Sequence, residues 1–424
     1  MQQNDHILGD VSLPTFLQEY WQQKPLLIRN ALPDYVCPIS ADEMAGLACE
    51  SEVESRIIVE HDGDTPWQCH YGPFEESQFS HLPETHWTLL LQSCNLHIVA
   101  FSQLLERFRF IPNWRVDDVM VSYAAPGGSV GPHLDNYDVF LLQAQGIRHW
   151  DISTEDYKDA DFVPDLDLKI LKSFSAEKSW KLEAGDMLYL PPGVAHHGVA
   201  DSDLTAEDCI TVSIGFRAPN GAELATALLD EVLSQHATSS TSYAESDSAS
   251  PFSSFYSDPN LDLQKNPGEI SRQALENINT MVQKALNSRI QDGDWFGKYI
   301  TNTGEVNEDL QSDETLSDMR QEEYLQPAGE GQQLVRNESS KLVFFISDKN
   351  AKNNNNDIHF FCNGHASYYP QDLLPIISLV CNHRYPPMGS LADMLESNDA
   401  KSFLANLINQ GHLYYEQDAD DNEY

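Results

Sequence analysis

The sequence predicts an α+β protein in which a β barrel or jelly roll is followed by a helical region and a small mixed C-terminal module. Short apolar runs separated by turn residues fill the stretch from Asp117 to Ala218, and many short strands at such spacing are typical of barrels and jelly rolls. After Pro219 the apolar residues recur at helical intervals. The β unit is therefore expected to end near residue 218.

The length of 424 residues suggests two or three domains at roughly 150 residues each. We expect a β domain with an N-terminal module at residues 1–218, a helical region at 219–310 and a C-terminal domain at 311–424. A Ser/Thr-rich stretch at about 237–257 contains few large aliphatic residues, so we expect it to be a linker inside the helical region.

The composition favours a cytoplasmic protein. No apolar run reaches the roughly 20 residues that a bilayer crossing needs, and the first residues lack the basic and apolar regions of a secretory signal. The seven cysteines are scattered and never form a CxxC pair, so they are expected to be reduced thiols. We therefore expect no membrane association.

The formal net charge of −41, from 66 acidic and 25 basic residues, repels nucleic acid and attracts basic partners. A basic protein substrate fits this charge. The alternative, that the acidity only reflects solubility or a salty habitat, is equally compatible with the composition.

The N-terminal module begins with a predicted amphipathic helix that carries Phe16, Leu17 and Trp21. Pro25 ends this helix, and a strand is expected at Leu26–Ile28. The central domain then contains five β-like runs: DVMVSYAAPGG, YDVFLLQAQG, RHWDIS, SWKLEAGDMLYLPPG and CITVSIGFRAP. Apolar and small residues alternate in the last run, as in a half-buried strand, so one of its faces must line a core or a cavity.

Two helices with apolar stripes are predicted after the β domain. The stripes consist of Leu224, Leu228, Val232 and Leu233 in the first helix and Leu275, Ile278, Val282 and Leu286 in the second. Such stripes are compatible with a dimerisation layer and with packing on their own domain.

The C-terminal region is expected to form a small winged-helix-like module. Strands are predicted in KLVFFIS and DIHFFC, and helices near Gln371–Cys381 and Lys401–Gln410. Acidic residues predominate here, which is the wrong sign for binding phosphates. We therefore expect no direct DNA binding.

A metal site is predicted around the sequence PHLDNYDVF. His133 and Asp135 are two residues apart, so on a strand both side chains leave the same face and can hold one ion. Such a pair also arises by chance, but a Gly-rich loop, APGGSVGP, precedes it and PPGVAHHGV follows it downstream. In a strand, His196 and His197 point to opposite sides, so only one of them can be a third ligand.

Two imidazoles and one carboxylate on one face of an octahedral ion leave three positions open, as an Fe(II) oxygenase needs for a keto acid and dioxygen. Zinc sites favour closed tetrahedral sets. The co-substrate 2-oxoglutarate has a distal carboxylate that needs a cation when it is buried. Arg148, on a neighbouring predicted strand, is the candidate; a surface arginine in a salt bridge is the alternative.

Several segments of the chain resemble the JmjC hydroxylases known as ribosomal oxygenases, most closely the bacterial branch that hydroxylates an arginine of large-subunit ribosomal protein sixteen. The resemblance covers most of the chain and includes FLQEYWQQKPLLIR, DDVMVSYAAPGGSVGPHLDNYDVFLLQAQGIRHW and LEAGDMLYLPPGVAHHG. It implies a JmjC/cupin double-stranded β-helix, a helical dimerisation region that makes a homodimer, and a C-terminal winged-helix-like domain. The PPGxxH spacing of the family selects His196 as the third metal ligand.

The resemblance also implies a reaction and a substrate pocket. Fe(II) and 2-oxoglutarate would hydroxylate the β-carbon of an arginine side chain, with release of succinate and CO2. Residues matching Asp118, Met120, Tyr137 and Ser213 would line the arginine pocket. The pattern of the chain agrees, because Asp118 and Met120 share one strand face and offer a carboxylate and an apolar wall, although ordinary strand residues would fit the same pattern.

Three other functions are compatible with parts of the sequence. The first is another JmjC activity, a histidine hydroxylase or a lysyl demethylase, which substrate mass spectrometry distinguishes. The second is a non-catalytic acidic chaperone of basic ribosomal proteins, which would not need the set His133, Asp135, His196 and Arg148. The third is a metal-dependent cupin isomerase or storage protein, which would not need Arg148.

Overall fold

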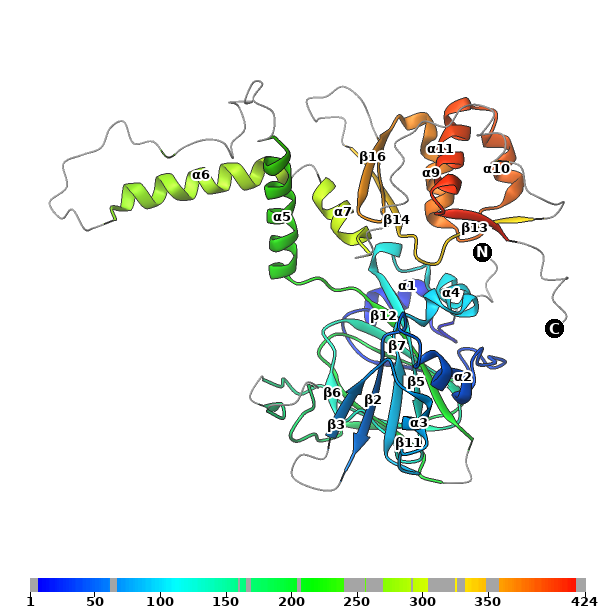
Figure 1. The fold of residues 1–424 in the computed structure, drawn as a ribbon. Helices are drawn as coiled ribbons and strands as arrows, with labels where there is room; N and C mark the ends of the chain where they lie inside the picture. The colour runs from blue at the N-terminus through cyan, green and yellow to red at the C-terminus, as the bar shows by residue number, and fades with distance from the viewer. Residues whose placement is uncertain are drawn as a thin grey trace. The chain divides into compact units, whose positions relative to one another are not determined.

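The chain divides into two compact units, Met1–Ala218 and Pro219–Tyr424, whose elements are drawn in Figure 1. None of the helices in the described part of the chain combines the length and apolar character that a bilayer crossing requires. The computed structural model describes residues 7–61, 67–158, 161–164, 169–203, 207–239, 256, 270–290, 293–303, 325, 332–347 and 358–416.

The described residues of the first unit form two antiparallel sheets. The eight-stranded sheet has the order β1 (Leu26–Ile28), β10 (Met187–Leu190), β7 (Asp138–Gln145), β12 (Cys209–Phe216), β5 (Val116–Ala124), β4 (Trp87–Leu91), β2 (Ser55–Glu60), β3 (Trp67–Tyr71). The four-stranded sheet has the order β6 (His133–Leu134), β11 (Ala195–Ala200), β8 (Arg148–Ser153), β9 (Lys178–Leu182). The helices of this unit are α1 (Leu13–Glu19), α2 (Ala41–Leu47), α3 (Glu76–Phe79) and α4 (Val99–Leu105).

Consecutive strands from β5 to β12 pass repeatedly from one sheet to the other. β5, β7, β10 and β12 belong to the large sheet, whereas β6, β8, β9 and β11 belong to the small one. This alternation winds the chain around an interior shared by both sheets. It confirms the predicted double-stranded β-helix.

The five predicted β runs all contain strands, but two features differ from the sequence prediction. The run 179–193 forms two strands in different sheets, β9 and β10. The strands β2, β3 and β4, within residues 55–91, extend the large sheet and were not predicted.

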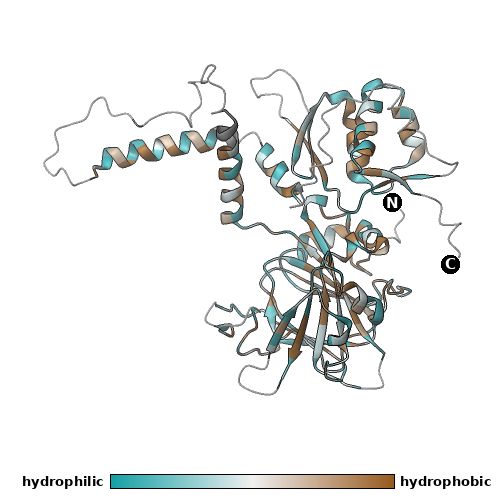
Figure 2. Ribbon diagram, viewed as in Figure 1, coloured by the Kyte–Doolittle hydropathy of each residue, from teal (hydrophilic) through white to brown (hydrophobic). Residues whose placement is uncertain are grey.

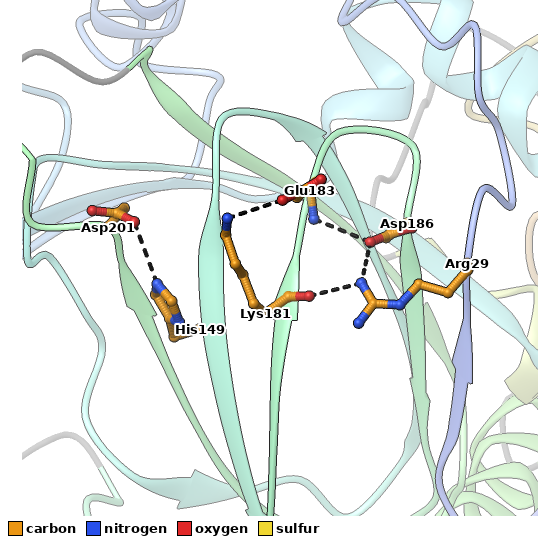
Figure 3. Close-up of polar contacts among 6 residues, drawn as sticks. All are labelled: Arg29, His149, Lys181, Glu183, Asp186 and Asp201. Atoms are coloured by element: carbon orange, nitrogen blue, oxygen red, sulfur yellow. Dashed lines mark hydrogen bonds and ion pairs between the residues drawn. The ribbon is translucent and has the colours of Figure 1, made fainter.

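Polar contacts connect the end of β1 to the turn between β9 and β10 (Figure 3). The buried carboxylate of Asp186 accepts a hydrogen bond from Arg29 Nη1 at 2.5 Å, and the same nitrogen donates to the Lys181 carbonyl at 2.7 Å. Gly185 in this turn has a φ of +88°, and a Cβ there would lie 2.7 Å from the Leu32 carbonyl oxygen. Glycine is therefore required where the chain changes sheets.

The N-terminal helix α1 packs through Phe16 into an aromatic core. Phe16 is fully buried, and its ring centroid lies 5.0 Å from that of Tyr189 and 5.6 Å from that of Phe140. The predicted helix and the strand at Leu26–Ile28 are present. Leu17, however, is 40% exposed, because it follows Phe16 by about 100° around the helix, and the helix ends before Trp21.

A second polar cluster joins four segments of the first unit at Asp138, the first residue of β7. The carboxylate is fully buried. It accepts hydrogen bonds from Gln22 Nε2 at 2.9 Å, Arg115 Nη2 at 3.0 Å and the Tyr189 hydroxyl at 2.6 Å. Three donors satisfy this charge, so its burial does not leave it unpaired.

Among its described residues, the second unit contains the helices α5 (Gly221–Ser239), α6 (Arg272–Ile290) and α7 (Asp294–Thr301), followed by a small α+β module. The module contains the sheets β14 (Leu342–Ile346), β15 (Ile358–Cys362), β16 (His365–Tyr369) and β13 (Gln333–Arg336), β17 (Leu413–Glu416), and the helices α9 (Leu374–Asn382), α10 (Met388–Met394) and α11 (Asn398–Asn409). The strands and helices predicted for a winged-helix-like domain are present.

The linker and the domain boundary expected in the second unit stay predictions. The linker expected at about 237–257 lies outside the described residues, apart from 237–239 and 256. The boundary is expected near 310; helix α7 precedes it in the sequence but packs against β14, β15 and β16, which follow it.

Asp138→Ala is expected to lower the free energy of unfolding by about 3–5 kcal/mol, because the partly buried Arg115 guanidinium loses its carboxylate. Tyr189→Phe removes one hydroxyl and should cost about 1–3 kcal/mol. Urea unfolding monitored by tryptophan fluorescence measures both. An Asp138→Ala variant that is no less stable than Tyr189→Phe would contradict the role of Asp138.

Candidate functional site

The interior between the two sheets of the first unit contains a cavity of about 440 Å³. Strands β2, β4, β5, β7 and β12 of the large sheet and β6, β8 and β11 of the small sheet contribute side chains to it. Every site residue expected from the sequence lines this cavity: Asp118, Met120, His133, Asp135, Tyr137, Arg148, His196 and Ser213.

Three potential metal ligands meet in the cavity wall. One ligand atom each of His133, Asp135 and His196 lies within 4.8 Å of the others. His133 and His196 are register partners on β6 and β11, and their ring centroids are 4.2 Å apart. Strand β6 ends at Leu134, so Asp135 is the first residue after the strand and not part of it. Its Oδ2 lies 3.7 Å from His196 Nε2.

Backbone carbonyls fix which nitrogen of each imidazole faces the cluster. His133 Nδ1 lies 2.9 Å from the Gly131 carbonyl oxygen, and His196 Nδ1 lies 3.0 Å from that of Val194. A carbonyl only accepts, so each Nδ1 carries the proton and each Nε2 offers a lone pair. Burial, with the neighbouring His133, lowers the pKa of His196 to about 4, which keeps this ring neutral and able to bind a metal near pH 7.

The structure separates the two adjacent histidines of β11. His196 is buried and belongs to the group of potential metal ligands with His133 and Asp135. His197 points to the other side of the strand, where its ring lies edge-on to Phe174 with centroids 6.1 Å apart. Of these two histidines, His196 is therefore the one that lies beside His133 and Asp135.

Arg148 is a buried cation at another part of the cavity. It is 2% exposed, and burial lowers the pKa of its guanidinium. Nη1 donates to Ser122 Oγ at 3.2 Å and Thr211 Oγ1 at 3.3 Å, and Nη2 donates to the Gly198 carbonyl at 3.4 Å. Nε finds no acceptor, and no carboxylate of the described residues forms an ion pair with Arg148. A buried charge in this state calls for an anionic ligand.

On the small sheet, Trp150 lies between Arg148 and His196. Residues 148, 150 and 152 share one strand face with His196 of the paired strand. The guanidinium carbon of Arg148 lies 5.2 Å from the Trp150 ring centroid, and this ring lies 5.7 Å from that of His196. A Cβ at Gly198 would lie 2.6 Å from the indole. Glycine therefore allows Trp150 to cover the space between the cation and the metal ligands.

The large sheet lines the opposite wall with alternate residues of two paired strands. Asp118, Met120 and Ser122 of β5 face the cavity, and Ser213 of β12 is the register partner of Met120. At roughly 3.3 Å per residue, Asp118 and Ser122 lie about 13 Å apart along the strand. The wall thus has hydroxyls beside Arg148 at one end and the Asp118 carboxylate at the other.

Hydrogen bonds hold the carboxylate of Asp118 in one orientation. Its Oδ2 accepts hydrogen bonds from Gln92 Nε2 at 2.7 Å and from the Ser93 backbone N–H at 2.8 Å. Burial raises the pKa of this carboxyl, and these two donors act in the opposite direction. Tyr137 lines the same cavity and is 42% exposed.

Sequence reasoning missed four residues of this site: Ser122, Thr211, Gln92 and Ser93. Ser122 and Thr211 were detectable, because they continue the two-residue alternation of Asp118 and Met120 and of Ser213 towards Arg148. Gln92 and Ser93 follow β4, a strand that was not predicted, so the sequence alone carried no signal for them.

The donor set suits a metal with open positions and an anionic co-ligand. Two neutral imidazoles and one carboxylate are the 2-His-1-carboxylate set of Fe(II) oxygenases. Arg148, which has no carboxylate partner among the described residues, offers a cation of the kind that the distal carboxylate of a keto acid needs. The residues present therefore fit Fe(II) together with 2-oxoglutarate.

Comparisons with known proteins agree with this geometry. Residues 103–224 match the JmjC domain family, and residues 287–414 match the ROXA-like winged helix. The chain is 32% identical to the ribosomal protein uL16 3-hydroxylase of Escherichia coli, over 95% of this chain and 97% of that protein. It is 38% identical to a probable ribosomal oxygenase of Haemophilus influenzae over 51% of each chain.

A solved structure shares the complete fold. The ribosomal oxygenase YcfD of Escherichia coli, in complex with cobalt and 2-oxoglutarate, superimposes with a TM-score of 0.75 at 30% identity. The match covers 96% of this chain and 99% of the solved one.

Substitution of the two adjacent histidines of β11 tests the metal site with a matched control. We expect His196→Gln to weaken Co(II) binding by about 100-fold or more, because a ligand is lost, and His197→Gln to leave it within about threefold. Isothermal titration calorimetry of the metal-free protein measures both affinities. Equal losses in the two variants would contradict the assignment of His196.

Proposed function

This chain belongs to the JmjC ribosomal oxygenases, and we propose that it hydroxylates the β-carbon of an arginine side chain in ribosomal protein uL16, the large-subunit protein sixteen. The single observation that carries the proposal is that one cavity brings together three kinds of group. These are the buried cation Arg148, the three potential metal ligands and the hydrogen-bonded carboxylate of Asp118. A keto acid and an arginine side chain each find a partner of opposite charge there.

His133, Asp135 and His196 are the proposed ligands of Fe(II). Bound there, the metal and 2-oxoglutarate would activate dioxygen: one of its oxygen atoms would replace a C–H hydrogen of the substrate by hydroxyl, and the other would enter succinate as CO2 is released. The protein contributes position: the carbonyls of Gly131 and Val194 orient the two imidazoles, and this orientation holds both Nε2 atoms towards one point.

Arg148 is proposed to bind the distal carboxylate of 2-oxoglutarate. The hydroxyl groups of Ser122 and Thr211 hold its Nη1, so the guanidinium is fixed before the co-substrate arrives and loses little side-chain freedom on binding. Trp150 packs beside the guanidinium and keeps water from one side of the ion pair, which strengthens it.

Asp118, Met120, Tyr137 and Ser213 are proposed to receive the arginine. The carboxylate of Asp118 pairs with a guanidinium, and the thioether of Met120 adapts to the methylene stem. Ser213 lies next to Met120 across the two strands. The strongly acidic chain, with a net charge of −41, attracts a basic ribosomal protein over longer distances.

The region after Pro219 is proposed to form a helical dimerisation layer, so that the protein is a homodimer. Figure 2 shows brown and teal residues alternating along α6. Leu275, Ile278 and Val282 on this helix are 50%, 44% and 51% exposed, and an apolar stripe of this kind is typical of an interface. A cytoplasmic location is proposed with it, because ribosomal proteins are made and assembled in that compartment.

Arg148→Gln is expected to raise the dissociation constant of 2-oxoglutarate about 100-fold, because the distal carboxylate loses its charged partner. Binding of Co(II) should stay unchanged, since Arg148 is not a metal ligand. Anaerobic titration of the Co(II)-loaded protein measures both. A variant with wild-type affinity for 2-oxoglutarate would exclude Arg148 as the anchor.

Hydroxylation is tested by incubating the Fe(II)-loaded protein with 2-oxoglutarate, air and purified uL16. We expect succinate and a single +16 Da shift on one arginine, both abolished by His133→Ala, because a metal ligand is lost. Peptide mass spectrometry locates the shift. A shift on histidine, loss of a methyl group from lysine, or an unmodified substrate would each overturn the arginine assignment.

The dimer is tested by multi-angle light scattering at micromolar concentration. Wild-type protein is expected to have the mass of two chains, and Ile278→Glu with Val282→Glu should give the mass of one, because a charge in an apolar interface is costly. Lys284→Glu, an exposed position on the same helix, serves as the control. A monomeric wild type would contradict the dimerisation layer.

A further inference from the structure

The two oxygens of the Asp118 carboxylate have different surroundings. Oδ2 accepts three hydrogen bonds, from Gln92 Nε2 at 2.7 Å, Ser93 N at 2.8 Å and Ser93 Oγ at 3.2 Å. None of the described residues donates a hydrogen bond to Oδ1. This oxygen lies beside Gly215 of β12, where a Cβ would be 3.6 Å away, so no side chain of that residue covers it.

The turn 92–95 after β4 is built to hold this carboxylate. Ser93 adopts the left-handed conformation, with φ 53° and ψ 32°, which is uncommon for a residue other than glycine and marks a backbone that its surroundings hold in place. On the next residue of β5, the Val119 N–H donates to Asn95 Oδ1 at 2.8 Å. The turn therefore makes hydrogen bonds to two adjacent residues of β5, to the side chain of Asp118 and to the backbone N–H of Val119.

The orientation of the Gln92 amide follows from its two neighbours. A carboxylate only accepts hydrogen bonds, so the Gln92 NH2 group must face Asp118. Gln92 Oε1 then faces Arg56, whose Nη2 donates to it at 3.4 Å. Arg56 is thus a cation in a pocket proposed to receive a cation, but its guanidinium is directed to the amide oxygen and not to Asp118.

We propose that Gln92 and Ser93 are positioning residues that determine specificity, because they occupy Oδ2 of Asp118 and leave Oδ1 free for the guanidinium of the substrate. The proposal rests on the proposed arginine hydroxylation. Without the three donors, the carboxylate would lose the hydrogen bonds that fix its orientation. With them, Oδ1 of the carboxylate stays available beside Gly215, and a cationic arginine side chain is favoured over a neutral side chain of the same shape.

The test compares binding of two peptides, identical except for arginine or citrulline at the target position. Citrulline has nearly the shape of arginine but no charge. The Co(II)-loaded protein with 2-oxoglutarate is titrated with each fluorescent peptide, and the ratio of the two dissociation constants is measured. Gln92→Met removes the strongest side-chain donor at similar length, Ser93→Ala removes the longest of the three bonds, and Gln68→Met on the exposed side of β3 is the matched control.

Gln92→Met is expected to weaken binding of the arginine peptide roughly tenfold and binding of the citrulline peptide less than about twofold. Binding of Co(II) and 2-oxoglutarate should stay unchanged. Ser93→Ala should change the ratio in the same direction by a smaller factor, and Gln68→Met should not change it. Equal weakening of both peptides, or an unchanged ratio in both variants, overturns the positioning role. If wild-type protein hydroxylates arginine and the ratio is unchanged, only this inference fails; if wild-type protein turns over 2-oxoglutarate but leaves arginine unmodified, the proposed function fails and this inference fails with it.

Discussion

The site depends on the alternation of side chains along β5 and β12. Because neighbouring residues of a strand leave opposite faces, the aliphatic residues Val119, Val121, Val212 and Ile214 are fully buried in the core of the large sheet. The residues between them line the cavity. One buried strand pair therefore both stabilises the domain and carries its polar groups, and a shift of register by one residue would exchange the two faces.

A second constraint is the uncompensated charge of Arg148. A fully buried guanidinium without a carboxylate destabilises the folded protein, and its hydroxyl and carbonyl neighbours reduce this cost only in part. In the proposed function, the dianionic co-substrate supplies the carboxylate that this group lacks. The metal ligands show the same logic in milder form, since burial and His133 keep His196 neutral and so ready to bind a cation.

Much of the fold and the metal centre were predictable, because they depend on local patterns. The spacing of His133 and Asp135, the strand after PPG and the polar alternation of CITVSIGF are all visible in the sequence. The choice of His196 over His197 needed either the family resemblance or the structure, because strand geometry alone leaves both open. The strands β2 to β4 and the role of Gln92 and Ser93 were not predictable, since they depend on contacts between distant segments and on one left-handed backbone residue.

The most direct test of the account is a crystal structure of the Co(II) protein with 2-oxoglutarate and an arginine-containing uL16 peptide. The account predicts metal bonds from Nε2 of His133 and His196 and from Asp135, the distal carboxylate of 2-oxoglutarate on Arg148, and the substrate guanidinium on Oδ1 of Asp118. A distal carboxylate placed away from Arg148, or an arginine side chain outside the cavity, would contradict it.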